Sequence, residues 1–446
     1  MTSLSSGDKG LAMAKIFIYA MNYAPEVAGV GHYTGEIGED FAANGHTVTV
    51  LTTVPHYPGW KVTPPYRNGR YGAETLGGAK VIRCPLILHE RMGGIWRLIA
   101  PASFAVTSAP IALWQILIHR PDVVLCIEPT LMGAPVAVAA ARLVGAKTVL
   151  HVQDHEVDAC FAVGHLSQIA WLEALAYFFE RHMLRRFDRL ITISAQMAER
   201  LVQKGVRRKH VAVVRNWVDL DHIKPLEGVS AYRQELGLAA EDRVVLYSGN
   251  IGAKQGLSEV IAAARRLGSR PHIKFIIAGE GPAKAELAAS AADLPNVRFL
   301  PFQPYERLSE FLGVADIHVL PQAPQAPDAT DLVLPSKLGG MLASGRRIVV
   351  TAAPGTELAT FLAGAAIVVA PGDASALAEA IAEAVDAAPR ADRAARRRAL
   401  AERLSKPDCL RDFRAFVLGQ TPAAEQPGTT AARPAEGVER PTEVVG

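Results

Sequence analysis

The chain has little of the chemistry that marks secreted, zinc-binding or nucleic-acid-binding proteins. Its 446 residues include only four cysteines, which are widely spaced and form no Cys-x-x-Cys pair. This usage is typical of a reduced, cytoplasmic compartment and argues against a structural zinc site. The formal net charge is only +3, and the one basic cluster, Arg390–Arg403, is typical of a solvated helix face. We therefore expect no nucleic-acid partner.

The sequence also lacks the apolar core of a secretory signal peptide, because Met1–Gly10 is polar. One uncharged window, Leu98–Ile118, is about long enough to span a bilayer. Pro101 and Pro110 interrupt it, and its hydroxyl and amide side chains dilute its apolar character. We expect a buried or membrane-grazing helical hairpin here, with a plain core helix or a true span as alternatives. The expected location is cytoplasmic, peripheral on the inner membrane.

Short β-branched runs alternate with helical patterns along most of the chain. A first series runs from Lys15–Ala20 to Val211–Val214, and a second begins at Val244–Leu246. Near-continuous apolar strands between helices predict parallel sheets covered on both faces. We therefore predict an α/β fold of two Rossmann-like, doubly wound domains that face each other across a cleft. The expected parts are a disordered segment 1–13, an N-terminal Rossmann-like domain 14–225, a C-terminal Rossmann-like domain 226–406, a helix 407–420 packing back toward the first domain, and a disordered tail 421–446.

Four loop signals follow the second series of strands in a fixed order. They are Tyr247–Gly256, Ala278–Pro282, Leu300–Pro304 and Asp331–Gly345. Ligands of open parallel sheets bind at the carboxyl ends of the strands, where helix N-termini direct N–H groups toward anions. Four such loops around one crevice predict a site for a nucleotide diphosphate.

Particular side chains in these loops suit a diphosphate and a nucleoside. Lys254, beside the backbone of Gly249 and Asn250, would neutralise the charge that builds on a leaving group. Ser336 suits a helix N-cap, and Lys337 adds a second positive charge. The expected base and ribose pocket comprises Gly279, Glu280, Gly281, Phe302 and Gln303. For Lys254 the alternative is an exposed lysine at a helix start. For Ser336 and Lys337 it is plain capping with an outward lysine, and for Glu280 it is an ordinary surface carboxylate.

A glycine loop in the first half, Pro25–Gly31, follows the first strand and opens a helix. Thr34 stands at the third glycine of the dinucleotide-binding pattern, and the second strand ends in two threonines rather than an acidic residue. The loop therefore fails the dinucleotide test. We expect Gly29 and Gly31 to admit an acceptor and to contact the transferred sugar.

The richest polar cluster, His151–Asp158, follows a core strand of the first half. Asp154, His155 and Asp158 are candidates to polarise an acceptor hydroxyl. His151 lies within the strand and is expected to be a core histidine. No helical or loop spacing here supports a metal site, so no metal is expected.

Several segments together carry a family likeness: Asn216–Asp219, Ser248–Asn250, Lys254–Gly256, Leu300–Leu308, His318–Gln322, Pro335–Leu338 and Met341–Gly345. Through them, residues 14–420 resemble the retaining glycosyltransferases of family 4, which have the GT-B fold. The resemblance is closest to the exopolysaccharide branch, of the colanic acid biosynthesis fucosyltransferase type.

Two features depart from the family pattern. An arginine commonly precedes the phosphate lysine, and Asn250 stands there. Two glutamates commonly flank the last loop, and Leu332 and Gly340 occupy their positions. Neither can hydrogen-bond a ribose through its side chain. Asp331, one residue away, is expected to take one of these roles.

The resemblance implies transfer of a sugar from a nucleotide diphosphate to a lipid-linked oligosaccharide, with retention of configuration. GDP-fucose is the expected donor, and a GDP-sugar is favoured over a UDP-sugar. No cofactor is implied, and Lys254 and Lys337 would handle the diphosphate. Two alternatives stay open: a UDP-sugar-dependent transferase of the same family, and a non-catalytic sugar-nucleotide-binding partner of another transferase.

Overall fold

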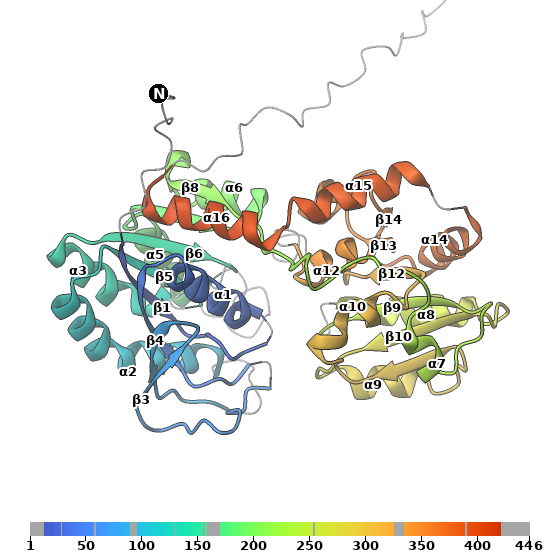
Figure 1. The fold of residues 1–446 in the computed structure, drawn as a ribbon, viewed down its shortest axis with the longest axis horizontal. Coiled ribbons are helices and arrows are strands. Elements are labelled where there is room, and N and C mark those ends of the chain that lie inside the picture. The colour runs from blue at the N-terminus through green and yellow to red at the C-terminus, as the bar shows by residue number, and fades with distance from the viewer. Residues whose placement is uncertain are drawn as a thin grey trace, which may run out of the picture.

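The computed structural model describes residues 13–27, 29–57, 59–89, 96–129, 131–154, 157, 170–252, 255–324, 334–388 and 390–420. They form two α/β lobes, each built on one sheet (Figure 1).

The N-terminal lobe contains an eight-stranded sheet in the order β3-β4-β2-β1-β5-β6-β7-β8. Its strands are β1 (Lys15–Ala20), β2 (Thr47–Thr53), β3 (Gly72–Leu76), β4 (Ala79–Cys84), β5 (Val123–Ile127), β6 (Lys147–Val152), β7 (Arg189–Thr192) and β8 (Val211–Val213). Neighbouring strands are parallel except β3, which is antiparallel to β4. The helices are α1 (Gly29–Ala43), α2 (Trp96–His119), α3 (Ala134–Val144), α5 (Ala170–Leu184) and α6 (Ala195–Gln203), with 3₁₀ turns η1 (Leu131–Gly133) and η2 (Arg208–His210).

The C-terminal lobe contains a six-stranded parallel sheet in the order β11-β10-β9-β12-β13-β14. Its strands are β9 (Arg243–Ser248), β10 (Ile273–Ala278), β11 (Val297–Leu300), β12 (Ile317–Leu320), β13 (Arg347–Thr351) and β14 (Ile367–Val369). Its helices are α7 (Ala231–Glu235), α8 (Leu257–Arg266), α9 (Lys284–Ser290), α10 (Leu308–Leu312), α12 (Lys337–Ala343), α13 (Glu357–Phe361), α14 (Ala374–Asp386) and α15 (Ala391–Glu402), with the 3₁₀ turn η4 (Tyr305–Arg307).

Each sheet separates two apolar cores, one on either face. The central strands β5 and β12 are buried at every position. Helices cover both faces of a parallel sheet, so its inner strands read as continuous apolar runs without alternation. The predicted fold class, two doubly wound α/β domains of the GT-B type, is confirmed.

The chain crosses between the lobes twice, and the crossing segments are hydrogen-bonded to each other. The Val218 N–H donates to the Leu404 carbonyl at 2.8 Å, and the Lys406 N–H donates to the Val218 carbonyl at 3.0 Å. Glu36 on α1 holds both crossings, because it accepts bonds from Trp217 Nε1 and from Lys406 Nζ, each at 2.6 Å. The hinge between the lobes is therefore anchored to the first lobe.

After the second crossing, α16 (Lys406–Leu418) returns to the N-terminal lobe (Figure 1). Leu410 and Phe413 join the core that includes β1 and α1. Pro407 lies in the first turn of α16, so the helix begins one residue before the expected range 407–420. Proline is tolerated there because the first turn has no intrahelical acceptor for its missing N–H.

The hairpin predicted for Leu98–Ile118 is wrong. The segment lies within one helix, α2, and both prolines are inside it. Ser108 fixes the helix to the sheet through a 2.5 Å hydrogen bond with the Tyr19 hydroxyl. Among the described residues, α2 is the one helix long and apolar enough to cross a membrane, and a third of its apolar window, 33%, is buried within the protein.

The predicted disordered segments, apart from Met13, lie outside the described residues.

Candidate active site

The loops that follow β9 and β10 pack backbone against backbone. Gly249 and Gly279 have φ angles of +149° and +147°, a region that strains other residues. A Cβ on Gly279 would lie 1.8 Å from the Gly249 carbonyl oxygen, and one on Gly281 would lie 2.2 Å from the Ile251 carbonyl oxygen. These glycines serve the packing of the two loops. Their contact with a phosphate stays a prediction.

Lys337 turns back over the first of these loops. Its Nζ donates to the Tyr247 hydroxyl at 2.6 Å and lies 4.2 Å from the centroid of that ring. Nζ would also lie 2.8 Å from a Cβ on Gly249. Burial lowers the pKa of Lys337 to about 7, and its contacts within the described part of the chain include no carboxylate. The alternative of an outward-pointing lysine is therefore wrong.

A buried histidine fixes α12, the helix that carries Lys337. His318 on β12 lies with Nε2 3.0 Å from the Ser344 hydroxyl, which itself donates to the Met341 carbonyl at 2.7 Å. The hydroxyl therefore accepts the imidazole N–H. Burial lowers the pKa of His318 to about 3, so the ring is neutral at physiological pH.

Ser336 does not cap α12, so its predicted N-cap role is wrong. It has helical angles, φ −56° and ψ −29°, and its side chain makes no capping hydrogen bond. An N-cap residue needs extended angles to aim its oxygen at the first helical N–H groups. The side chain is exposed instead, and donor binding by Ser336 stays a prediction.

The residues predicted to bind base and ribose lie on the loops after β10 and β11. Glu280 is exposed and pairs with Lys284 at 2.7 Å. The Gln303 side chain accepts from the Tyr232 hydroxyl at 3.0 Å and donates to the Pro301 carbonyl at 2.9 Å. Phe302 remains 46% exposed, so its ring is available for stacking.

On the N-terminal side, a buried carboxylate organises the glycine loop. Glu26 is 5% exposed and accepts the N–H groups of His56 and Tyr57 at 2.9 and 3.0 Å. A Cβ on Gly31 would lie 2.2 Å from its Oε2, and Gly29 begins α1 with φ +65°. Gly31 therefore leaves room for Glu26, whereas a Cβ on Gly29 would lie 2.8 Å from the Tyr57 ring. Glu26 was not among the predicted site residues, although a lone acid in a loop that opens a helix was an available signal.

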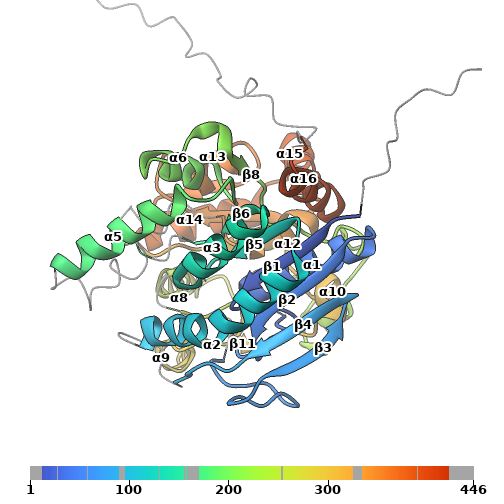
Figure 2. The same cartoon turned by 90° about the vertical axis from the view of Figure 1, so that its left-hand side faces the viewer.

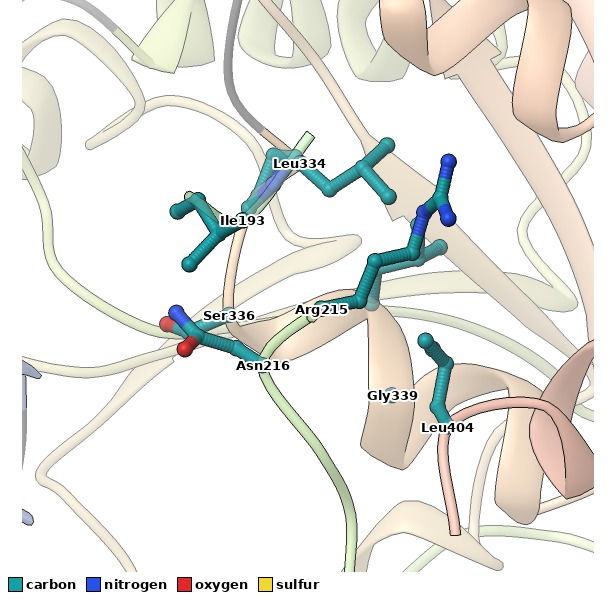
Figure 3. Close-up of a pocket in the computed structure, with 9 residues that line it drawn as sticks. Ile193, Arg215, Asn216, Leu334, Ser336, Gly339 and Leu404 are labelled. Carbon is teal, nitrogen blue, oxygen red and sulfur yellow. The ribbon is translucent and has the colours of Figure 1, made fainter. Parts of the chain in front are cut away.

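The residue after β7, the first crossing segment and the loop before α12 meet in a cleft between the lobes. Asn216 on the first crossing donates to Gln153 Oε1 at 3.1 Å, and the exposed Asp154 follows next in the chain. In Figure 3, Asn216 lies beside Ser336, while Arg215 extends its guanidinium away from both. The cleft is lined by Ile193, Arg215, Asn216, Leu334, Pro335, Ser336, Leu338, Gly339 and Leu404.

Four predicted site residues lie outside the described residues: Lys254, His155, Asp158 and Asp331. Within the part of the chain that the structure describes, no three His, Cys, Asp or Glu side chains are grouped to hold a metal ion. His151 is buried in β6 and packs edge-on against Phe413 at 5.0 Å. Burial lowers the pKa of His151 to about 3, which keeps it neutral in the core.

Each lobe matches the model of a known protein family. Residues 28–217 match the model of the glycosyl transferase 4-like domain, and residues 229–400 match that of glycosyl transferases group 1. The chain is 40% identical over 376 residues to a protein of Escherichia coli K12 named as a colanic acid biosynthesis glycosyl transferase, WcaI. That match covers 81% of this chain and 90% of the relative. The chain belongs to the family 4 glycosyltransferases.

Solved structures share the fold of this glycosyltransferase. Sucrose-phosphate synthase from Thermosynechococcus elongatus matches with a TM-score of 0.67 and 17% identity, over 90% of this chain and 98% of that one. The Anabaena protein HepE in complex with UDP-glucose matches with a TM-score of 0.63 and 16% identity, over 91% and 99%. The family models and the relative WcaI are those of glycosyl transferases, which sets the non-catalytic alternative aside.

In this glycosyltransferase an ion pair also joins the first crossing segment to the C-terminal lobe. Arg215 pairs with Glu357 on α13 at 2.9 Å, and both side chains are largely buried. The Glu357 carboxylate also accepts the Ala195 and Gln196 N–H groups, at 3.4 and 3.3 Å, at the start of α6. A carboxylate is favourable at a helix N-terminus, so Glu357 ties the C-terminal lobe to the N-terminal lobe.

Proposed function

We propose that this glycosyltransferase transfers fucose from GDP-fucose to a hydroxyl of a lipid-linked oligosaccharide during exopolysaccharide assembly, with retention of configuration. The relative WcaI, named for colanic acid biosynthesis, supports an exopolysaccharide role through 40% identity along most of both chains. A nucleotide-sugar donor is supported by the loops at the carboxyl edge of the C-terminal sheet.

The observation that carries the proposal is Lys337. A partly buried cation without a carboxylate neighbour among the described residues is favourable only when an anion joins it. It lies over the loop after β9, where parallel α/β sheets bind ligands. The diphosphate of a nucleotide sugar supplies such an anion, and Lys254 would add a second charge as the leaving group forms.

On the acceptor side, the supporting feature is the cleft between the lobes. Gln153 is held by Asn216, which lines the same cleft as Ser336. The carboxylate of Asp154, directly after Gln153, is therefore near the meeting point of the two lobes. In the proposed role Asp154 polarises the acceptor hydroxyl while the sugar–phosphate bond breaks.

A panel of GDP-, UDP-, TDP- and ADP-sugars in a thermal-shift assay tests the donor. A ligand at ~100 times its Kd stabilises the folded state by about 2.7 kcal/mol, and we expect GDP-fucose to give the largest shift. Transfer to a lipid-linked acceptor, followed by NMR of the product's anomeric proton, tests the reaction and its stereochemistry. A larger shift with a UDP-sugar would identify the alternative donor class.

We further propose that the enzyme lies on the cytoplasmic face of the inner membrane, where a lipid-linked acceptor resides. Figure 2 shows α2, α3 and α5 along one face of the N-terminal lobe. Val106, Trp114 and Ile118 on α2 are 75%, 61% and 60% exposed. Exposed apolar side chains of this size support contact with a lipid surface. Arg120 directly follows α2 and would meet lipid phosphates.

A further inference from the structure

We propose that Tyr247 is a positioning residue, which holds the side-chain nitrogen of Lys337 over Gly249 at the place where the donor's diphosphate binds. This inference rests on the proposed function, because it assigns Lys337 to the donor. Tyr247 occupies the last buried position of β9, and its ring is fully buried.

The direction of the hydrogen bonds shows what the hydroxyl does. The Tyr247 O–H donates to the Asn250 carbonyl at 2.5 Å, so its proton is already engaged. The phenol oxygen then offers a lone pair, and Lys337 Nζ donates to it at 2.6 Å. The same nitrogen lies 4.2 Å from the ring centroid, where the face of the aromatic ring attracts a cation. The oxygen and the ring together fix one position for Nζ.

The charge balance around this nitrogen favours an incoming anion. Of the described side chains that contact Lys337, Tyr247 is the titratable one, and burial raises its pKa, so it stays neutral. Gly249, which also approaches Lys337, contributes only backbone. Within the described part of the donor loops, the acidic side chain is that of Glu280, which is paired with Lys284 at 2.7 Å. Lys254 and Asp331 lie outside the described residues.

Burial lowers the pKa of Lys337 to about 7, so a large fraction of the free enzyme carries a neutral amine at physiological pH. A diphosphate favours the ammonium form, and donor binding would then take up a proton. Below a pH of about 7 the ammonium is already present, and affinity should not depend on pH. Above it, affinity should fall by up to about tenfold per pH unit.

Removal of the phenol oxygen should shift this titration downward. In Tyr247→Phe the ammonium loses an acceptor, and the loss of one hydrogen bond to a charged group lowers its pKa by about one unit. A structural defect alone would weaken donor binding equally at every pH. The dependence on pH therefore distinguishes positioning from general damage.

The first experiment needs no donor. Competitive labelling of amines with acetic anhydride, read by mass spectrometry across a pH series, measures the titration of Lys337 in the free protein. We expect a midpoint near 7 in the wild type and a lower one in Tyr247→Phe. Tyr19→Phe is the matched control, because Tyr19 is also fully buried and its hydroxyl is bonded to Ser108 at 2.5 Å. Coinciding midpoints in wild type and Tyr247→Phe would overturn the positioning role.

The second experiment measures the affinity of GDP-fucose and of UDP-glucose between pH 6 and pH 8.5. Nucleotide sugars are the right probes, because both phosphates are esterified, whereas a terminal phosphate itself titrates near ~6. We expect affinity to begin falling about one pH unit lower in Tyr247→Phe than in wild type or Tyr19→Phe. A uniform loss of affinity would overturn the inference. If Lys337→Met binds the nucleotide sugars as tightly as the wild type, the proposed placement of the donor is overturned. The amine-labelling experiment would then decide by itself whether Tyr247 positions Lys337.

Discussion

Lys254 and Lys337 are the two cations in the predicted donor loops, and in the proposed reaction both would stabilise the leaving diphosphate. For Lys254→Ala we expect turnover to fall by about 10²-fold or more, because loss of one preorganised group that stabilises developing charge has this effect. The fold should persist, which circular dichroism and the melting temperature would show. Steady-state transfer assays measure the effect, with the exposed Lys224→Ala as the control. Near-normal turnover in a folded Lys254→Ala variant would remove this residue from the catalytic machinery.

A substitution of Asp154 tests the proposed activation of the acceptor hydroxyl. Asp154→Asn keeps the size of the side chain but removes its ability to accept a proton. We expect donor binding to be retained and transfer to be lost, as measured by the donor-induced thermal shift and by product formation. A parallel collapse of donor affinity would place Asp154 in the donor pocket or in the framework of the fold.

The contact between Lys337 and Tyr247 also shows where prediction from sequence ends. The motif around Lys337 is recognisable, but its partner lies 90 residues earlier in the chain. Their meeting depends on how α12 packs beside β9, and no local pattern encodes that packing. The same holds for Ser336, whose residue type suits an N-cap although the backbone before α12 is already helical.

At the scale of elements, the central strands could be predicted and the edges could not. The predicted strand Lys15–Ala20 matches β1, because this strand is an apolar run buried at every position after the first. The edge strand β3 was missed, since its five residues are exposed or half-buried and carry no such run. In α2, two prolines suggested a break, but packing against α3 and the sheet keeps the helix continuous.

The donor loops themselves should be intolerant of any side chain at Gly279. In Gly279→Ala the new Cβ would lie 1.8 Å from a carbonyl oxygen, in addition to the strain of a φ of +147°. Gly364→Ala is the matched control, because Gly364 has φ +76° and open space around it. We expect the control to lose about 1 kcal/mol of unfolding free energy and Gly279→Ala clearly more, with loss of donor binding. Chemical denaturation measures both, and equal losses would show that the loops can separate freely.

At the scale of the whole molecule, two hydrogen-bonded crossings and the Arg215–Glu357 contact join the lobes on one side of the cleft. The N-terminal lobe holds both crossings through Glu36 and receives α16. Both crossing segments are therefore attached to the N-terminal lobe. The exposed apolar face of α2 lies on this same lobe.

The final prediction concerns this membrane contact. A spanning α2 would have to leave the core, where Ser108 and Phe104 are buried against the sheet, and would place Gln115 in hydrocarbon. Peripheral contact needs only its exposed face, so we expect part of the protein to sediment with membranes and to be released by high salt or alkaline carbonate. In the double variant Trp114→Glu, Ile118→Glu the sedimenting fraction should fall several-fold, because charge is unfavourable among lipid chains. The single variant Val229→Glu, which adds the same kind of charge at an 80% exposed residue just before α7, should leave it unchanged. Resistance to carbonate, with release only by detergent, would instead make α2 a true anchor.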